Sequence, residues 1–332
     1  MSNTQKPKGE GPGRTCHSAQ RLATITRHTT SAANVSRPNK RPKLIAMFGA
    51  SLNPVTLAHV AIVQALLDEK WNAHVRENLC GAGNSLCDPE APDNDAPLFD
   101  EVWVLPVYSH PDVEKYKHIQ HINNRTPEQD ELLDIYRKKK ELHDSFNDRV
   151  RLCQVAFADH PRVKVKTYER DLWEFFDTFE PERFDQSPRS HGEKYAGTLH
   201  LIRWILGAES YEGDSTFKAH QAAGTEFAWF MGQDTWASYV KGHWMGKFEL
   251  QTRVHLVNAP RDGRKCGPLV PVPGTKPPIA LDHLDVIPTS STEARKCAQE
   301  HDGQALRKQV PEMVADYIEK HNLYSAARTH EA

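Results

Sequence analysis

The chain has 332 residues, a formal net charge of −2 at pH 7 and 38% hydrophobic residues. The near-neutral charge gives no reason to expect nucleic acid as a partner, and no apolar run is long enough to cross a bilayer. The length allows one large α/β domain or two modest ones, and the low hydrophobic content indicates polar insertions around an ordinary core. We therefore expect a soluble protein that needs neither nucleic acid nor a membrane.

The cysteine pattern gives no sign of a structural metal site. The six cysteines are scattered, and none forms the closely spaced pairs of a zinc site. Cys80 and Cys87 share one polar loop, so a local disulfide or metal pair is the alternative there, although a chain of this length needs no such link. Reduced thiols indicate a cytoplasmic location.

Both ends of the chain are predicted to be disordered tails. Residues 1–42 have no apolar periodicity, and they contain several basic residues but a single acidic one, Glu10. This composition predicts disorder, and the same is expected of residues 326–332. A start rich in Arg, Ser and Thr and poor in acids is also typical of an organelle transit peptide, which is the alternative to a cytoplasmic location.

From residue 43 onward, apolar runs that predict strands alternate with segments that predict helices. The predicted strands are residues 44–48, 100–106, 163–165, 227–231, 254–257 and a short run at 286–287. The predicted helices are residues 57–67, 136–142, 148–158, 198–206, 293–300 and 311–321. This alternation predicts an α/β fold with a Rossmann-like doubly wound parallel sheet, in a single domain of residues 43–325. The insertions are residues 72–97, 112–145 and 259–284, whose role the sequence leaves open.

Residues 44–59 predict a buried strand, a tight turn at Gly49 and a helix that begins with Thr56 and His59 on one face. A junction of this kind leaves the first N–H groups of the helix unpaired and directs the positive end of the helix dipole at the turn. A phosphate suits such a junction. The alternatives are an ordinary Gly-containing turn and a His that only caps or packs the helix.

Ligands of a doubly wound sheet bind at the carboxyl ends of its strands, where further polar residues are expected here. Residues 106–117 follow the second predicted strand and include Lys117. Gly232 and Asp234 follow the most apolar predicted strand. Asp234 therefore either binds a ribose hydroxyl or caps the next helix.

Another polar cluster, residues 289–295, marks a predicted helix start near the C-terminus. Its Ser and Thr residues, Ser291 and Thr292 among them, are typical of a helix N-cap. Arg295 in the first turn, however, opposes the helix dipole. A bound phosphate would compensate for this conflict, which favours a functional interpretation.

The order Gly-x-Ser-x-Asn-Pro-x-Thr-x-x-His at residues 49–59 resembles the T/HxGH motif of the nucleotidyltransferase superfamily. Residues 290–295 match the Ser-Ser-Thr-x-x-Arg motif of one family in it, and residues 310–324 are similar to the C-terminus of that family. Shorter matches lie at residues 101–106, 110–111, 146–150, 195–199 and 230–234. Together these segments resemble the nicotinate/nicotinamide mononucleotide adenylyltransferase family.

The resemblance implies adenylyl transfer from ATP to nicotinate or nicotinamide mononucleotide, which yields the dinucleotide and pyrophosphate. ATP and the mononucleotide are the implied partners, with Mg²⁺ bound mainly through the ATP phosphates. The implied catalytic residues are His59, Thr56 and Arg295. The implied ATP-binding residues are Gly49, Ala50, Ser51, Asn53, His59, Gly232, Asp234, Ser291, Thr292 and Arg295. The implied mononucleotide-binding residues are Lys117, Lys140, Thr198 and Trp244, and which lysine contacts the substrate is left open.

Four positions depart from the family pattern. Thr56 stands where many members have His, Ala58 replaces the usual Gly, Leu52 an aromatic residue and Gln233 a small one. Because phosphopantetheine adenylyltransferase favours Thr at the position of Thr56, an enzyme of that kind is one alternative. A catalytically inactive nucleotide-binding homologue is another. The preferred mononucleotide, the oligomeric state (a homo-oligomer included) and the effect of Ala58 stay open.

Overall fold

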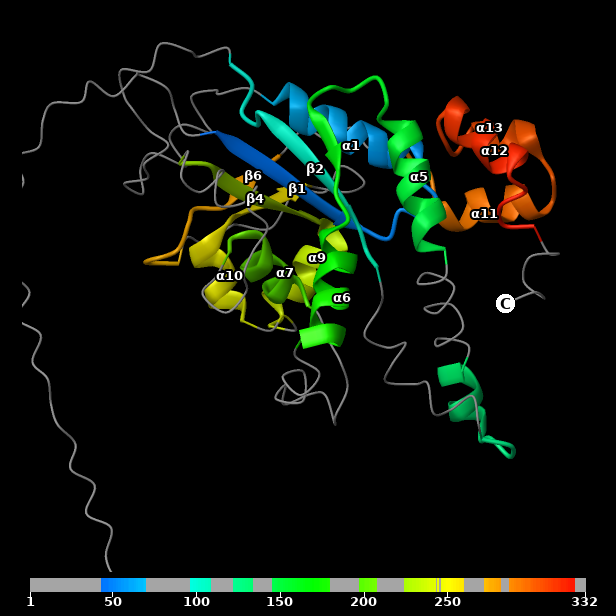
Figure 1. The fold of residues 1–332 in the computed structure, drawn as a ribbon, viewed down its shortest axis with the longest axis horizontal. Coiled ribbons are helices and arrows are strands. Elements are labelled where there is room, and N and C mark those ends of the chain that lie inside the picture. The colour runs from blue at the N-terminus through cyan, green and yellow to red at the C-terminus, as the bar shows by residue number, and fades with distance from the viewer. Residues whose placement is uncertain are drawn as a thin grey trace, which may run out of the picture. The chain divides into compact units, whose positions relative to one another are not determined.

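Six parallel strands form the sheet at the centre of the fold, in the order β3-β2-β1-β4-β5-β6 (Figure 1). The strands are β1 (Leu44–Ala50), β2 (Glu101–Pro106), β3 (Val163–Val165), β4 (Glu226–Gly232), β5 (His255–Ala259) and β6 (Ile279–Ala280). The chain builds outward from β1 to β3 on one side and from β4 to β6 on the other, so β1 and β4 form the switch point of a doubly wound sheet. The predicted Rossmann-like α/β fold class is therefore confirmed.

The computed structural model describes residues 43–69, 96–108, 122–133, 145–179, 197–207, 224–242, 244, 246–259, 272–281 and 287–325, all within one unit, Asn39–Ala332. At residues 176–179, 233–234 and 259 it describes the backbone alone. The predicted tails, the predicted helix at 136–142 and the pair of Cys80 and Cys87 lie outside the described residues. In the described part of the chain, no helix has the length and apolarity needed to cross a membrane.

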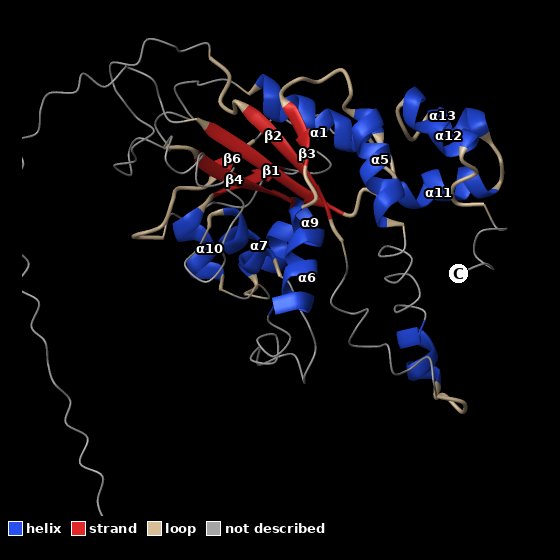
Figure 2. Ribbon diagram, in the orientation of Figure 1, coloured by secondary structure: helices blue, strands red, loops and turns tan. Residues whose placement is uncertain are grey.

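Helices cover both faces of the sheet (Figure 2). The core on the first face includes residues of α1 (Leu57–Asp68), α5 (Phe146–Ala156), α11 (Ser291–Gln299), α12 (Gly303–Arg307) and α13 (Glu312–Lys320). The core on the second face includes residues of α6 (Tyr168–Phe179), α7 (Thr198–Ile205), α9 (Gln233–Val240) and α10 (Lys247–Arg253).

The central strands contribute to both cores because successive side chains of a strand point to opposite faces. In β1, Leu44, Ala46 and Phe48 enter the first core, whereas Ile45 and Met47 enter the second. A strand that is buried on both faces has no polar side, which explains the unbroken apolar runs of the sequence.

Several short elements differ from the sequence prediction. Ile279–Ala280 pairs with β5 as the sixth strand, whereas Ile287, in the short run expected to form a strand, is exposed and outside the sheet. The prediction also lacks α6, α9, α10 and α12. The strand β6 and the helices α9, α10 and α12 have two to eight residues, which is shorter than the windows in which periodicity can be read. The twelve-residue α6 is long enough for such a window, and the sequence prediction missed it all the same.

The sheet has a carboxyl edge, where all of its parallel strands end and where the segments after β1, β2 and β4 begin. The helix α1 returns across the sheet to reach the parallel strand β2, so its C-terminal end lies at the opposite, amino edge. Figure 1 shows α11, α12 and α13 beside α5. The carboxyl edge is where the fold places a ligand.

Candidate functional site

The turn after β1 does not occur at Gly49. The strand continues through Gly49, which pairs with Leu105, to Ala50. A Cβ atom at Gly49 would lie 2.7 Å from Cη2 of Trp229, so the missing side chain makes room for this tryptophan of β4. The chain turns instead at the fully buried Leu52, whose φ of 50° is left-handed and costs a non-Gly residue on the order of 1–3 kcal/mol.

Thr56 and His59 form a capping box at the start of α1. The backbone N–H of Thr56 donates to Nδ1 of His59 at 2.9 Å, and Thr56 Oγ1 lies 2.9 Å from the same nitrogen. A backbone N–H can only donate, so Nδ1 is the acceptor and the neutral imidazole carries its proton on Nε2. His59 thus caps the helix, and the cap also fixes the ring with Nε2–H as a donor.

The next two N–H groups of α1 are bonded to the C-terminal part of the chain. Leu57 N donates to the carbonyl of Gln309 at 3.0 Å, and Ala58 N donates to Oγ1 of Thr289 at 3.0 Å. The expectation that these donors are unpaired is therefore wrong, because residues more than 230 positions away fold back onto the helix start. A phosphate cannot use the two N–H groups without displacing Thr289 and Gln309.

The start of α11 lies against the loop that follows β1. Ser290 is its N-cap, and Ser290 Oγ accepts from the N–H of Thr292. Ser291 Oγ donates to the carbonyl of Pro54 at 2.9 Å, and Arg295 Nη1 donates to the carbonyl of Asn53 at 2.7 Å. The two bonds join residues that lie 237 and 242 positions apart in the sequence, so they bring together two distant motifs.

Arg295 keeps part of its hydrogen-bonding capacity. Besides the bond to Asn53, it bonds to the carbonyl of Ser291 from Nη1 and to Oγ1 of Thr292 from Nη2, at 3.3 and 3.5 Å. None of these bonds to described residues uses Nε, and a guanidinium has five N–H donors. The side chain is half-buried and Thr292 is exposed, so this end of α11 is open to an anion.

Arg149 of α5 joins the carboxyl ends of β1 and β2. It is 0% exposed, and it donates from Nη1 to the carbonyl of Ser51 at 2.6 Å and from Nη2 to the carbonyl of Val107 at 2.7 Å. Burial lowers the pKa of this guanidinium to about 10, so it stays charged at neutral pH. Sequence reasoning did not include Arg149 in the site, although the residue lies in the segment 146–150 that resembles the family, and the observed helix begins two residues before the predicted start at 148.

Asn53 is bonded through both of its oxygens. Its backbone oxygen accepts from Arg295, and its side-chain Oδ1 accepts from the hydroxyl of Tyr324 at 2.8 Å. Sequence reasoning included Asn53 but not Tyr324, for which the only signal was the similarity of residues 310–324 to the family C-terminus. Gln309 gave no signal, and Thr289 was included only as the first residue of the polar cluster 289–295.

Gly232 ends β4, beside β1 at the switch point, and caps α9. Among the described residues other than its chain neighbours, no atom lies within 4 Å of a Cβ built on Gly232, so their packing does not explain this glycine as it explains Gly49. Asp234 lies in the first turn of α9 rather than at its N-cap, and its side chain is outside the described part. Phe48 connects this region to α1, because its ring lies 5.3 Å from that of Phe230 and 5.9 Å from that of His59.

The residues expected to bind the mononucleotide are placed only in part. Thr198 is the first residue of α7, and the preceding Gly197 N–H donates to Nδ1 of His200 at 3.3 Å. Trp244 packs edge-to-face on Tyr239, 5.9 Å away, against the core that contains α7. Lys117 and Lys140 lie outside the described residues.

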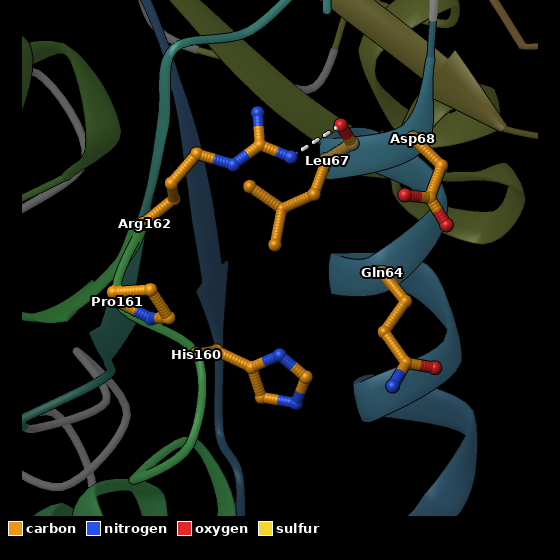
Figure 3. A pocket seen from close by; sticks show the side chains of 6 residues that line it. All are labelled: Gln64, Leu67, Asp68, His160, Pro161 and Arg162. Atoms are coloured by element: carbon orange, nitrogen blue, oxygen red, sulfur yellow. Dashed lines mark hydrogen bonds between the residues drawn. The ribbon is translucent and has the colours of Figure 1, made fainter.

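A cavity of about 290 Å³ lies elsewhere, between the C-terminal half of α1 and the segment before β3 (Figure 3). It is lined by Gln64, Leu67, Asp68, His160, Pro161 and Arg162. Arg162 Nη2 donates to the carbonyl of Leu67 at 2.7 Å, so this guanidinium holds the end of α1. The cavity is at the amino edge of the sheet and is not part of the candidate site.

No family model and no curated protein matches the chain. Among solved structures, it is similar to the nicotinic acid mononucleotide adenylyltransferase of Plasmodium falciparum complexed with APC, with 16% identity and a TM-score of 0.45 over 85% of this chain and 97% of that chain. The same enzyme complexed with NaAD gives 16% identity and a TM-score of 0.43 over the same shares. Similarity at this level does not assign a function, which has to come from the residues of the site.

Proposed function

We propose that the protein transfers an adenylyl group from ATP to nicotinate or nicotinamide mononucleotide. The observation that carries the proposal is the bonding of Ser291 and Arg295 to the carbonyls of Pro54 and Asn53 at the carboxyl edge of the sheet. It joins residues 49–59 and residues 290–295, two segments of the family resemblance, into one wall, with His59 nearby at the start of α1.

In this reaction, a phosphate oxygen of the mononucleotide attacks the α-phosphorus of ATP, and the bond to pyrophosphate breaks. No protein nucleophile takes part, so the protein contributes by positioning the two phosphates and neutralising their charge. His59 serves as a donor to the phosphates through Nε2–H, the proton position that the capping bond to Thr56 selects. Arg295 and Thr292 bind the β- and γ-phosphates at the open start of α11.

The remaining site residues bind other parts of the two substrates or support the site through packing. Ala50 and Ser51 line the ATP phosphates at the end of β1, and Gly49 acts through packing. Gly232 leaves open space at the end of β4, where Asp234 binds the ribose of ATP. Trp244 stacks on the pyridine ring and backbone groups near Thr198 bind its carboxylate or amide, while Lys117 or Lys140 binds the mononucleotide phosphate.

Mg²⁺ is expected to accompany ATP. Within the described ranges, no three His, Cys, Asp or Glu side chains form a group that could hold a metal ion. The hydroxyl and backbone oxygens near Thr292 suit a hydrated Mg²⁺ that is held mainly through phosphate oxygens. The ion would supply charge neutralisation of the ATP phosphates.

One observation favours a second candidate, a nucleotide-binding protein without catalysis. The N–H groups of Leu57 and Ala58, which the predicted strand–turn–helix junction leaves unpaired for a phosphate, are bonded to Gln309 and Thr289. If the reaction needs these two donors, the chain binds ATP without turning it over.

A pyrophosphate-release assay tests the proposed function and separates the alternatives. Wild-type protein is mixed with ATP, Mg²⁺ and, in parallel, nicotinate mononucleotide, nicotinamide mononucleotide, 4′-phosphopantetheine or no acceptor. We expect pyrophosphate and a dinucleotide with one or both pyridine mononucleotides alone. Release with phosphopantetheine alone supports the sister enzyme, and ATP binding in calorimetry without release supports the inactive homologue; either result contradicts the proposal.

A further inference from the structure

Asn53 is almost completely buried, and the C-terminal segment determines how its carboxamide is oriented. Only 5% of the residue is exposed. Because the hydroxyl of Tyr324 donates to Oδ1 at 2.8 Å, the oxygen of the carboxamide faces Tyr324. The NH₂ group lies on the other side of Cγ and supplies the two donors of this side chain.

Tyr324 reaches Asn53 from a backbone conformation that has to be maintained by packing. Its φ is 64° and that of Asn322 is 49°, both in the left-handed region that costs a non-Gly residue on the order of 1–3 kcal/mol. Between them, Leu323 is buried in the first core, and its N–H donates to the carbonyl of Ile318 at 3.0 Å. The end of the chain is thus anchored so that the phenol lies at the loop after β1.

The bond from Tyr324 to Asn53 is one of three described hydrogen bonds that the C-terminal part of the chain makes to residues 53 and 54 of the loop after β1. The carbonyls of Asn53 and Pro54 accept from Arg295 and Ser291, and Tyr324 supplies the one described bond to the Asn53 side chain itself. Rotation of this side chain about χ2 would exchange its oxygen and its NH₂ group, and the bond that Tyr324 donates to Oδ1 favours the arrangement in which the loop presents the NH₂ donors.

We propose that Tyr324 is a positioning residue of the site, whose hydroxyl holds the Asn53 carboxamide with its NH₂ group directed to the nucleotide. This inference rests on the proposed adenylyl transfer. Tyr324 acts through Asn53 and does not itself touch the substrate. A phosphate or ribose oxygen is the kind of acceptor that the NH₂ group suits.

A double-mutant cycle tests this inference, with Tyr324→Phe, Asn53→Ala and the double variant compared with wild type. Tyr317→Phe, in α13 of the same segment, is the matched control for loss of a tyrosine hydroxyl. We expect Tyr324→Phe to lower kcat/KM by about tenfold, as for one lost hydrogen bond. In the Asn53→Ala background the same change should lower kcat/KM less than about twofold, since there is no carboxamide left to orient.

Hydrogen exchange of residues 50–60 without substrate gives a readout that is independent of turnover. Faster exchange in Tyr324→Phe than in Tyr317→Phe is expected, again only when Asn53 is present. Wild-type kcat/KM and exchange in Tyr324→Phe, or a loss that persists in full in the Asn53→Ala background, would overturn the inference. Absence of turnover in the wild type would refute the proposed function instead, and the exchange cycle would then decide the positioning role.

Discussion

The starts of α1 and α11 both face the loop that follows β1, but their polar groups are used differently. At α1, Thr56 and Ala58 are buried, and the N–H groups of Leu57 and Ala58 are bonded to the C-terminal segment. At α11 the N-cap Ser290 and the following Thr292 are exposed, and Arg295 is only half-buried. Two helix starts with similar sequence signals therefore differ: the first is a structural junction with one directed imidazole, and the second is exposed and is where we propose that the ATP phosphates bind.

The largest effect on turnover is expected at His59, the one group of the α1 start that we assign to the reaction. His59→Ala should lower kcat by about a hundredfold or more, because one preorganised donor to the reacting phosphates is lost. The measurement is pyrophosphate release at saturating substrates. Near-normal turnover of a folded His59→Ala protein would remove His59 from the mechanism.

His59→Glu separates the cap from the chemistry. Glu at this position of a capping box accepts from the Thr56 N–H but offers no N–H donor. We expect His59→Ala to lose about 1 kcal/mol of unfolding free energy and His59→Glu to regain most of it, with both variants inactive. Recovery of turnover in His59→Glu would contradict the role of Nε2–H.

The second-largest effect is expected at the α11 start. Arg295→Ala should weaken ATP binding by roughly thirtyfold, because it removes a charged donor worth about 2 kcal/mol, and should affect mononucleotide binding far less. Calorimetry with each substrate separately measures both effects. Lys296→Ala removes an exposed charge from the next position of the same helix and serves as the control. Equal losses for both substrates would contradict the assignment of Arg295 to ATP.

A crossed pair of hydroxyl substitutions sharpens the comparison of the two helix starts. Thr289→Val leaves the buried N–H of Ala58 without its acceptor and should cost about 1–3 kcal/mol of unfolding free energy, with ATP affinity within about threefold of wild type. Thr292→Val removes an exposed hydroxyl and should show the reverse: weaker ATP binding and a change in unfolding free energy under about 0.5 kcal/mol. Tighter ATP binding by Thr289→Val would show that phosphate competes for the Ala58 N–H.

The smallest effect on turnover is expected at the amino edge of the sheet, where His255 is fully buried. Its Nδ1 donates to the carbonyl of Pro277 at 3.0 Å, its Nε2 lies 3.8 Å from a carboxylate oxygen of Glu226, and burial lowers its pKa to about 4. The unfolded chain takes up this proton near pH 6.5. The unfolding free energy is therefore complete above pH 6.5 and falls by up to about 3 kcal/mol as the pH drops to 4.

His255→Gln removes this titration and should flatten the pH dependence of unfolding between pH 6.5 and 4, without changing kcat/KM at pH 7.5. Chemical denaturation at several pH values measures the slope. An unchanged slope in His255→Gln would show that other groups govern acid sensitivity. A loss of turnover would show that the amino edge and the site are coupled.

The sequence was sufficient for the parts of the fold that depend on local patterns. The apolar runs of β1, β2 and β4 and the periodicity of α1 predict these elements within one or two residues. It also predicted that the segments after β1, β2 and β4 begin at the carboxyl edge, because parallel strands place their ends together. The two-residue β6 was missed, since it is too short to carry a pattern.

The details of the site depended on contacts between distant residues, which local patterns do not contain. In the sequence, Gly49 cannot be distinguished from a glycine that is needed for a turn. In the structure, the ring of Trp229 requires it, because it leaves no room for a Cβ atom. Thr289 seals the start of α1 from a position 231 residues away. Arg149 lies in the segment 146–150 that resembles the family, and only the folded chain shows it bonded to the ends of two strands.

Titration of isotope-labelled protein with ATP, followed by NMR, tests most directly the claim that phosphates bind at the start of α11. We expect the Arg295 Nε–H signal and the Thr292 amide signal to shift with ATP concentration. The amide of Ala58 is bonded to Thr289, so its chemical shift should change on addition of ATP by only a small fraction of the changes seen for Arg295 and Thr292. A dominant shift at Ala58 with Arg295 unchanged would contradict the account and place the phosphates at α1.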